Sequence, residues 1–151
     1  MTSPALPDSP AAGLAADLAE ESEQLQILAR SLDLPPVGAD PALALSRHLL
    51  TALVHVATTT ATAAAVVDLS DTPTPTHLRS LASITSGLSC TLAATSAMAN
   101  TLYRLATDAD PAELLRGSRT RAAALLTSAS AHLGTAAAQL RPPQRATDPA
   151  A

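Results

Sequence analysis

The stretch SLASITSGLSCTLAATSAMANTLY, residues 80–103, decides the fold of this chain of 151 residues. Arg79 precedes it and Arg104 follows it, and it contains no Asp, Glu, Lys, Arg or His. Alternating steps of three and four residues, sustained for about four heptads, are a strong helical signal. Here they select a seam made of Leu78, Leu81, Thr85, Leu88, Leu92, Thr95, Ala99, Leu102 and Ala106. The spacing therefore predicts a long helix that packs along this seam.

The opposite side of the same helix carries small residues, in place of the charged residues expected on a solvated helix surface. A surface of small side chains lets the backbone of another helix approach closely. We therefore predict that this side binds a second helix, from another copy of the chain or from a partner protein. The predicted contacts are Ser83, Gly87, Cys90, Ala94 and Ala97.

The composition also favours packed helices. Hydrophobic residues make up 47% of the chain, yet there is no Phe or Trp and only one Tyr. A core of Leu, Val, Ile and Ala fills a closely spaced helix–helix interface well, and the length suits one domain. Arg is the only strongly basic residue type, and together with the Ala, Pro and Thr content this indicates a high-G+C bacterial genome.

Capping and turn signals divide the chain into four helices. Ser9, Asp40 and Asp110 each precede a proline, the pattern of an N-cap followed by Pro at the first helical position. The helices are predicted at about residues 10–33, 41–69, 76–107 and 111–141. The last of them has a regular seam of its own, which we expect to pack against a neighbouring helix: Leu115, Arg119, Ala122, Leu126, Ala129, Leu133, Ala136 and Leu140. Short connections favour antiparallel neighbours. The prediction is an all-α, up-down-up-down four-helix bundle in residues 10–141, between disordered tails at residues 1–9 and 142–151.

Several function classes are disfavoured by the residues. A net charge of -4 argues against nucleic-acid binding, which needs a basic surface. The single cysteine rules out an internal disulfide framework. There is no Gly-x-Ser-x-Gly elbow and no Gly-rich phosphate loop, so we expect neither an enzyme nor a cofactor. The N-terminal residues lack the pattern of a secretory signal, which makes the cytoplasm the expected location.

A membrane-associated helical protein is an alternative. Residues 49–67, 80–103 and 122–140 each extend over about a bilayer's length without an Asp, Glu or Arg. Their many Thr and Ser hydroxyls, and a histidine in two of them, offset much of the roughly 0.3–0.6 kcal/mol that each Leu or Val gains on insertion. The composition therefore argues against a membrane-spanning protein without removing this alternative.

Two further sets of residues are candidates for binding. His48, His55 and His132 would serve a ligand- or metal-binding bundle, although no Glu-x-x-His pair or internal acid accompanies them in their helices. Arg116, Arg119 and Arg121 lie in the first turns of the last helix, where the helix dipole disfavours cations. Such a departure from a local rule can mark a functional surface, so these arginines are a second candidate for partner binding. The function expected from the sequence is that of a non-enzymatic interaction or structural protein that works through helix–helix contacts.

Overall fold

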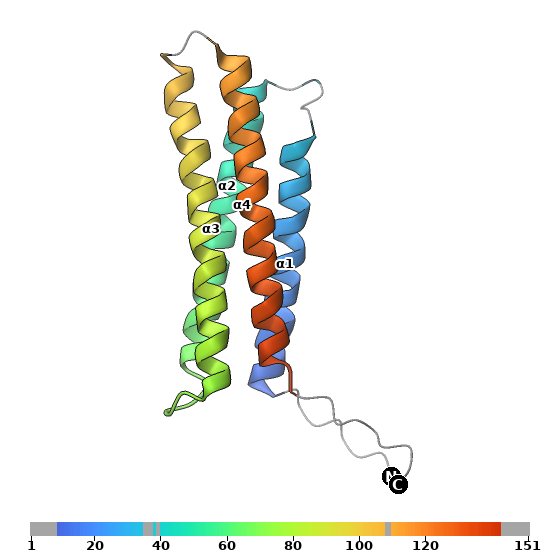
Figure 1. Cartoon of the computed structure of the whole chain (residues 1–151), viewed down its shortest axis with the longest axis vertical. Coiled ribbons are helices and arrows are strands. Elements are labelled where there is room, and N and C mark those ends of the chain that lie inside the picture. Colours follow the sequence, from blue (N-terminus) through green and yellow to red (C-terminus); the bar gives the residue numbers. More distant parts are fainter. Residues whose placement is uncertain (1–8, 35–37, 39, 108–109, 143–151) are drawn as a thin grey trace, which may run out of the picture.

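The computed structural model describes residues 9–34, 38, 40–107 and 110–142. In these residues the chain forms four helices: α1 (Pro10–Asp33), α2 (Pro41–Val67), α3 (Pro75–Leu105) and α4 (Pro111–Leu140). The helices run side by side along the long axis, and each reverses the direction of the one before it (Figure 1). The predicted four-helix bundle is confirmed. The expected disordered tails lie outside the described residues, apart from Ser9 and Pro142.

Each helix begins with a proline that follows a capping side chain. An oxygen of that side chain accepts a hydrogen bond from a backbone N–H of the first turn, which satisfies one of the free donors of a helix start. The capping residues are Ser9, Asp40, Thr74 and Asp110. Three of these starts agree with the sequence prediction. The cap at Thr74 sets the start of α3 one residue earlier than predicted.

The core is formed mainly by α1, α3 and α4. Helix α4 packs most extensively, against α3 and α1, whereas α2 packs on α3 and α1 and hardly touches α4. The Leu and Ala seam predicted for the last helix is its buried side. Its fully buried members are Ala122, Leu126, Ala129, Leu133 and Ala136.

The buried side of α3 differs from the predicted seam. Leu78 and Leu92 of that seam are 54% and 45% exposed. The buried residues instead include Gly87 and Ala94, which the sequence placed on the opposite side. A Cβ on Gly87 would lie 2.9 Å from Cδ2 of Leu133 and 3.2 Å from the carbonyl oxygen of Ala129. Helix α3 is therefore turned so that its small residues receive α4, and one edge of the heptad seam faces outward.

A reciprocal pair of serines joins α1 and α4. The Ser22 hydroxyl donates to the carbonyl oxygen of Ser130 at 2.7 Å, and the Ser130 hydroxyl donates to the carbonyl oxygen of Ser22 at 2.7 Å. Small side chains bring these two backbones close, and each hydroxyl satisfies a polar group at the buried interface. The contact holds α1 and α4 in one relative register.

Helix α2 is the peripheral member of the bundle. Its buried residues are spaced seven apart and form a single line: Leu45, Ala52, Thr59 and Val66. By comparison, ten residues of α4 are buried. A single buried line leaves most of the circumference of α2 outside the core.

The close approach of α3 and α4 leads to a first prediction. In an open helix, Gly→Ala stabilises by about 0.8–1 kcal/mol through helix propensity. At Gly87 the added methyl group would crowd Leu133 and Ala129, at a cost of about 1–3 kcal/mol. We expect Gly87→Ala to lower the free energy of unfolding, measured with urea, by about 1 kcal/mol.

Gly117→Ala is the matched control, because a Cβ at Gly117 meets nothing within 4 Å. It lies in α4 and should raise the stability by about 0.5–1 kcal/mol. An equal gain in both variants would contradict the proposed packing of α3 on α4.

Candidate functional site

The small-residue side of α3 is occupied within the chain. Gly87 and Ala94 are buried, and Cys90 is half-buried and packs on the core. The Ser83 hydroxyl donates to Oε1 of Gln139 on α4 at 3.1 Å. The carbonyl oxygen of Ala97 accepts a weak hydrogen bond from Ser118 of α4 at 3.5 Å. The second helix that packs against this side in the structure is α4 of the same chain, so the exposed surfaces of the bundle are the better candidates for partner binding.

Exposed hydrophobic side chains gather on α2 and α3. Of the ten large hydrophobic residues that are exposed in the described part of the chain, eight belong to these two helices. They are Leu43, Leu50, Leu53, Val54 and Val67 on α2, and Leu78, Leu92 and Tyr103 on α3. Leu50 is 62% exposed and Tyr103 is 78% exposed. Single exposed hydrophobic residues scattered over a surface are ordinary, but leucines this exposed on two neighbouring helices form a hydrophobic patch.

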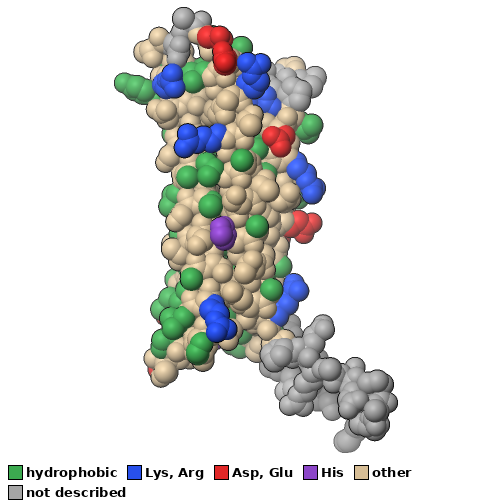
Figure 2. Space-filling view, in the orientation of Figure 1, with side chains coloured by type: hydrophobic (Ala, Val, Ile, Leu, Met, Phe, Trp, Pro, Cys, Tyr) green, Lys and Arg blue, Asp and Glu red, His purple; other side chains and the backbone are tan. Residues whose placement is uncertain are grey.

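The same part of the surface carries almost no charge. No Asp, Glu, Lys or Arg lies between Arg47 and Asp68 on α2, or between Arg79 and Arg104 on α3. On the side formed by α3, α4 and α1, charged side chains gather toward the α3–α4 connection and along the α1 edge (Figure 2). Hydrophobic side chains gather along the α3 edge in the same view.

The contacts of α2 and α3 place their exposed residues on one continuous surface. His55 of α2 pairs with Glu21 of α1, so the opposite flank of α2 is turned toward α3. Ser83 of α3 binds Gln139 of α4, so the opposite flank of α3 is turned toward α2. At 100° per residue, the exposed leucines fall on these two facing flanks. We call this surface the outer α2–α3 face: Leu50, Leu53, Ala57, Ala64 and Val67, with Leu78, Thr85, Leu92, Ala99 and Tyr103.

Threonine hydroxyls on these helices are satisfied without water. On α2, the hydroxyls of Thr51, Thr58, Thr60 and Thr62 each donate to the carbonyl oxygen four residues earlier, at 2.8–3.1 Å. On α3, Thr85 does the same at 2.8 Å. A hydroxyl that donates within its own helix does not lose that hydrogen bond when an apolar surface covers it. Thr85 belongs to the outer α2–α3 face, so its hydroxyl adds little polar cost when this face is removed from water, whereas Thr58 and Thr62 lie on the flank of α2 that faces α1.

Arg119 has a structural partner within the chain. Its Nε donates to the carbonyl oxygen of Leu32 at 2.9 Å, and its Nη2 donates to the carbonyl oxygen of Leu34. These are carbonyls at the end of α1, where the helix dipole favours a cation. This contact explains an arginine at a seam position. Arg116 and Arg121 are exposed on either side of it, and their role in partner binding stays a prediction.

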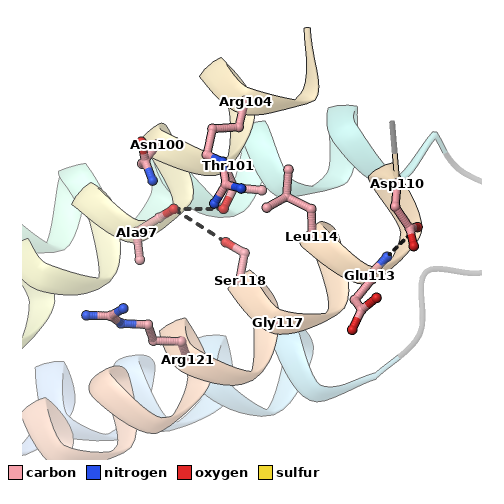
Figure 3. A pocket seen from close by; sticks show the side chains of 10 residues that line it. All are labelled: Ala97, Asn100, Thr101, Arg104, Asp110, Glu113, Leu114, Gly117, Ser118 and Arg121. Atoms are coloured by element: carbon pink, nitrogen blue, oxygen red, sulfur yellow. Dashed lines mark hydrogen bonds between the residues drawn. The ribbon is translucent and has the colours of Figure 1, made fainter. Parts of the chain in front are cut away.

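A shallow cleft of about 480 Å³ lies where α3 ends and α4 begins (Figure 3). Arg104 and Arg121 line it together with Asp110 and Glu113, and the two acids lie at the opposite end from Arg121. Its remaining lining residues are Ala97, Asn100, Thr101, Leu114, Gly117 and Ser118. Two cations and two anions give the cleft no single sign of charge, so it shows no preference for an anionic or a cationic ligand.

The histidines have separate surroundings. His55 pairs with Glu21, and His48 lies near Arg119. Burial, and to a smaller extent the charge of Arg119, lower the pKa of His48 from its ordinary value of 6.5. His132 is half-buried on α4. Among the residues that the structure describes, no group of three His, Cys, Asp or Glu side chains is placed to hold a metal ion.

Helices α2 and α3 are both long and apolar enough to cross a membrane. Of the most apolar 18-residue stretch, 17% is buried in α2 and 33% in α3. Core helices of water-soluble proteins meet the same length and composition, but they are mostly buried. Helix α2 is not. This exposure makes the outer α2–α3 face the main candidate for an interaction surface.

Comparison with known proteins finds no relative: no family model, no curated protein and no solved structure matches the chain.

The contact of Arg119 with the end of α1 leads to a second prediction. Arg119→Met keeps the aliphatic part of the side chain and removes both hydrogen bonds. We expect a loss of about 1–3 kcal/mol in the free energy of unfolding, because carbonyls of the α1 terminus lose charged donors. Arg116→Met, three residues away and exposed, should stay within about 0.5 kcal/mol of the parent. Equal effects of the two substitutions would show that the contact contributes nothing to stability.

The environment of His48 leads to a third prediction. Because the pKa of His48 is lowered in the folded state, the unfolded chain binds more protons as the pH falls below about 6.5. Stability from this residue is present above that pH and is lost below it. His48→Gln should therefore lose less stability than the parent between about pH 7.5 and about pH 5.5 in urea titrations. A parallel loss in both proteins would rule out this contribution.

Proposed function

We propose that this protein is a non-enzymatic interaction or structural protein. Its outer α2–α3 face binds helices that lie on the surface of another protein molecule. The observation that carries the proposal is the exposure of α2. It is the most apolar of the four helices, yet it is the least buried. Its own bundle leaves this apolar surface in water, and a second helical surface would cover it.

The energetics favour an apolar partner surface. Burial of one leucine side chain is worth about 1.5–3 kcal/mol. Four leucines of the face are at least 45% exposed: Leu50, Leu53, Leu78 and Leu92. A partner that covers them gains part of this free energy of burial at each of the four positions. The hydroxyl of Thr85 on the same face donates within its own helix, which keeps the polar cost of covering it low. A face of this kind suits helix–helix packing better than recognition of a charged molecule.

The ionisable side chains that the structure draws together support a structural role. Arg119 binds the end of α1, and Glu21 pairs with His55 to join α1 and α2. These groups hold helices in place. The cleft between α3 and α4 mixes charges of both signs, which is a poor arrangement for binding and activating one substrate group.

A membrane- or lipid-associated helical protein is the second candidate, because α2 and α3 have the length and composition to enter a bilayer. Insertion of both would separate α3 from α4 and break the hydrogen bonds that the Ser83 and Ser118 hydroxyls donate between these two helices. Each unsatisfied polar group in hydrocarbon costs several kcal/mol. We therefore favour a protein partner in the cytoplasm.

The proposal is tested with a photoreactive benzophenone amino acid placed at Leu50 or Leu92 in the full chain, in the native host. We expect discrete protein adducts on irradiation, because both positions lie on the face that the partner covers. The control position is Ile27 on α1, which has a matching exposure of 46% and lies off the face. Flotation of the purified chain with lipid vesicles is measured in parallel.

Protein adducts from Leu50 and Leu92 with none from Ile27 would support the proposed function. Equal adducts from all three positions, or none from the face, would contradict it. Flotation with vesicles in the absence of protein adducts would favour the membrane alternative.

A further inference from the structure

The exposed residues of α2 change in size along the helix. In its first half the exposed residues include Leu43, Leu50, Leu53 and Val54. In its second half they include Ala57, Ala61 and Ala64. Apart from Val67 at the end of α2, the large exposed apolar residues thus lie on one side of Ala57 along the helix axis and the exposed alanines lie on the other. When a second copy of this surface is turned end over end and placed on the first, the large residues of each copy face the small residues of the other.

We propose that the outer α2–α3 face binds a second copy of this chain, with the two copies antiparallel about a two-fold axis that passes near Ala57. This inference rests on the proposed function and names the partner. In a two-fold interface, each contact occurs twice. Leu50 lies seven residues before Ala57 and Ala64 lies seven after it, so leucine packs on alanine at both ends.

Helix α3 fits the same two-fold axis. If the axis passes near Ser89, Leu92 packs over Thr85 of the second copy, and Leu78 packs over Ala99. Both pairs set a large exposed residue against a smaller one. Alternation of large and small side chains across facing positions is what allows two helical layers to interdigitate.

The charges at the two ends of α2 favour the antiparallel arrangement. Arg47 lies ten residues before Ala57, and Asp68 lies eleven residues after it. The proposed axis therefore brings Arg47 of each copy near Asp68 of the other. A parallel pair would instead gather Asp68 and Asp71 of both copies at one end, where like charges repel.

The size of the face is sufficient for a stable dimer. Helices of 27 and 31 residues are about 40 Å long or more at 1.5 Å per residue, and two neighbouring helices are about 20 Å wide. The footprint is therefore on the order of 800 Å², the area that each partner of a standard interface buries.

The experiment uses the full chain carrying Cys90→Ala, which removes the native thiol, and Ala57→Cys, which places one thiol near the proposed axis. Light scattering gives the solution mass, and a short bis-maleimide linker tests whether the introduced thiols of two copies meet. We expect twice the mass of a single chain and a covalent dimer formed at least about tenfold faster than for Ile27→Cys in the same background. Leu50→Glu should raise the dissociation constant at least about 100-fold, because it buries an unpaired charge.

Each outcome decides a separate point. A dimer that links through the thiol introduced by Ala57→Cys and is dissociated by Leu50→Glu supports the inference. A dimer dissociated by Leu50→Glu but without that covalent link overturns the antiparallel arrangement, while the proposed function of the face stands. A monomer at all concentrations overturns the second copy as partner, and adducts from Leu50 and Leu92 then decide whether the proposed function fails too. Circular dichroism of every variant confirms that the helices are intact.

Discussion

The close approach of α3 to α4 at Gly87 is the constraint on which the rest of this bundle depends. The absence of a Cβ there lets Leu133 and the backbone at Ala129 lie against α3. Close packing between two helices fixes their relative rotation, because a turn of either one would replace small side chains with large ones. With α3 rotated in this way, Leu78 and Leu92 are turned outward. The outer surface of the protein is thus a consequence of how its interior is packed.

Helix α2 shows the other consequence of this packing. Since α4 is already covered by α1 and α3, α2 is bound along one line of residues and leaves its other sides in water. Its exposed apolar side chains are separated by threonines whose hydroxyls are bonded within the helix. A surface with few charges and few unsatisfied donors loses little when it is covered. The surface through which we propose association is exposed because α2 is peripheral. Both features follow from the packing of α4 between α1 and α3.

Polar contacts inside the bundle hold the helices in register. Ser22 and Ser130 exchange hydrogen bonds between α1 and α4, and Glu21 and His55 join α1 to α2. Arg119 reaches from α4 to the end of α1, where its charge complements the helix dipole. Arg119 and His55, which the sequence suggests as binding residues, thus hold helices in position. The small-residue side of α3 likewise serves the fold of a single chain.

The sequence by itself determined the number of helices, the first residue of three of them, and the buried side of α4. These features are local: a proline after a capping side chain starts a helix, and a regular Leu and Ala seam in α4 leaves one choice of buried side. The tertiary structure alone decided which side of α3 is buried and where Arg119 binds. Periodicity shows which residues share a side, but both sides of α3 lack charge, so only packing against α4 selects between them. The partner of Arg119 lies 87 residues earlier in the chain, beyond the reach of any local pattern.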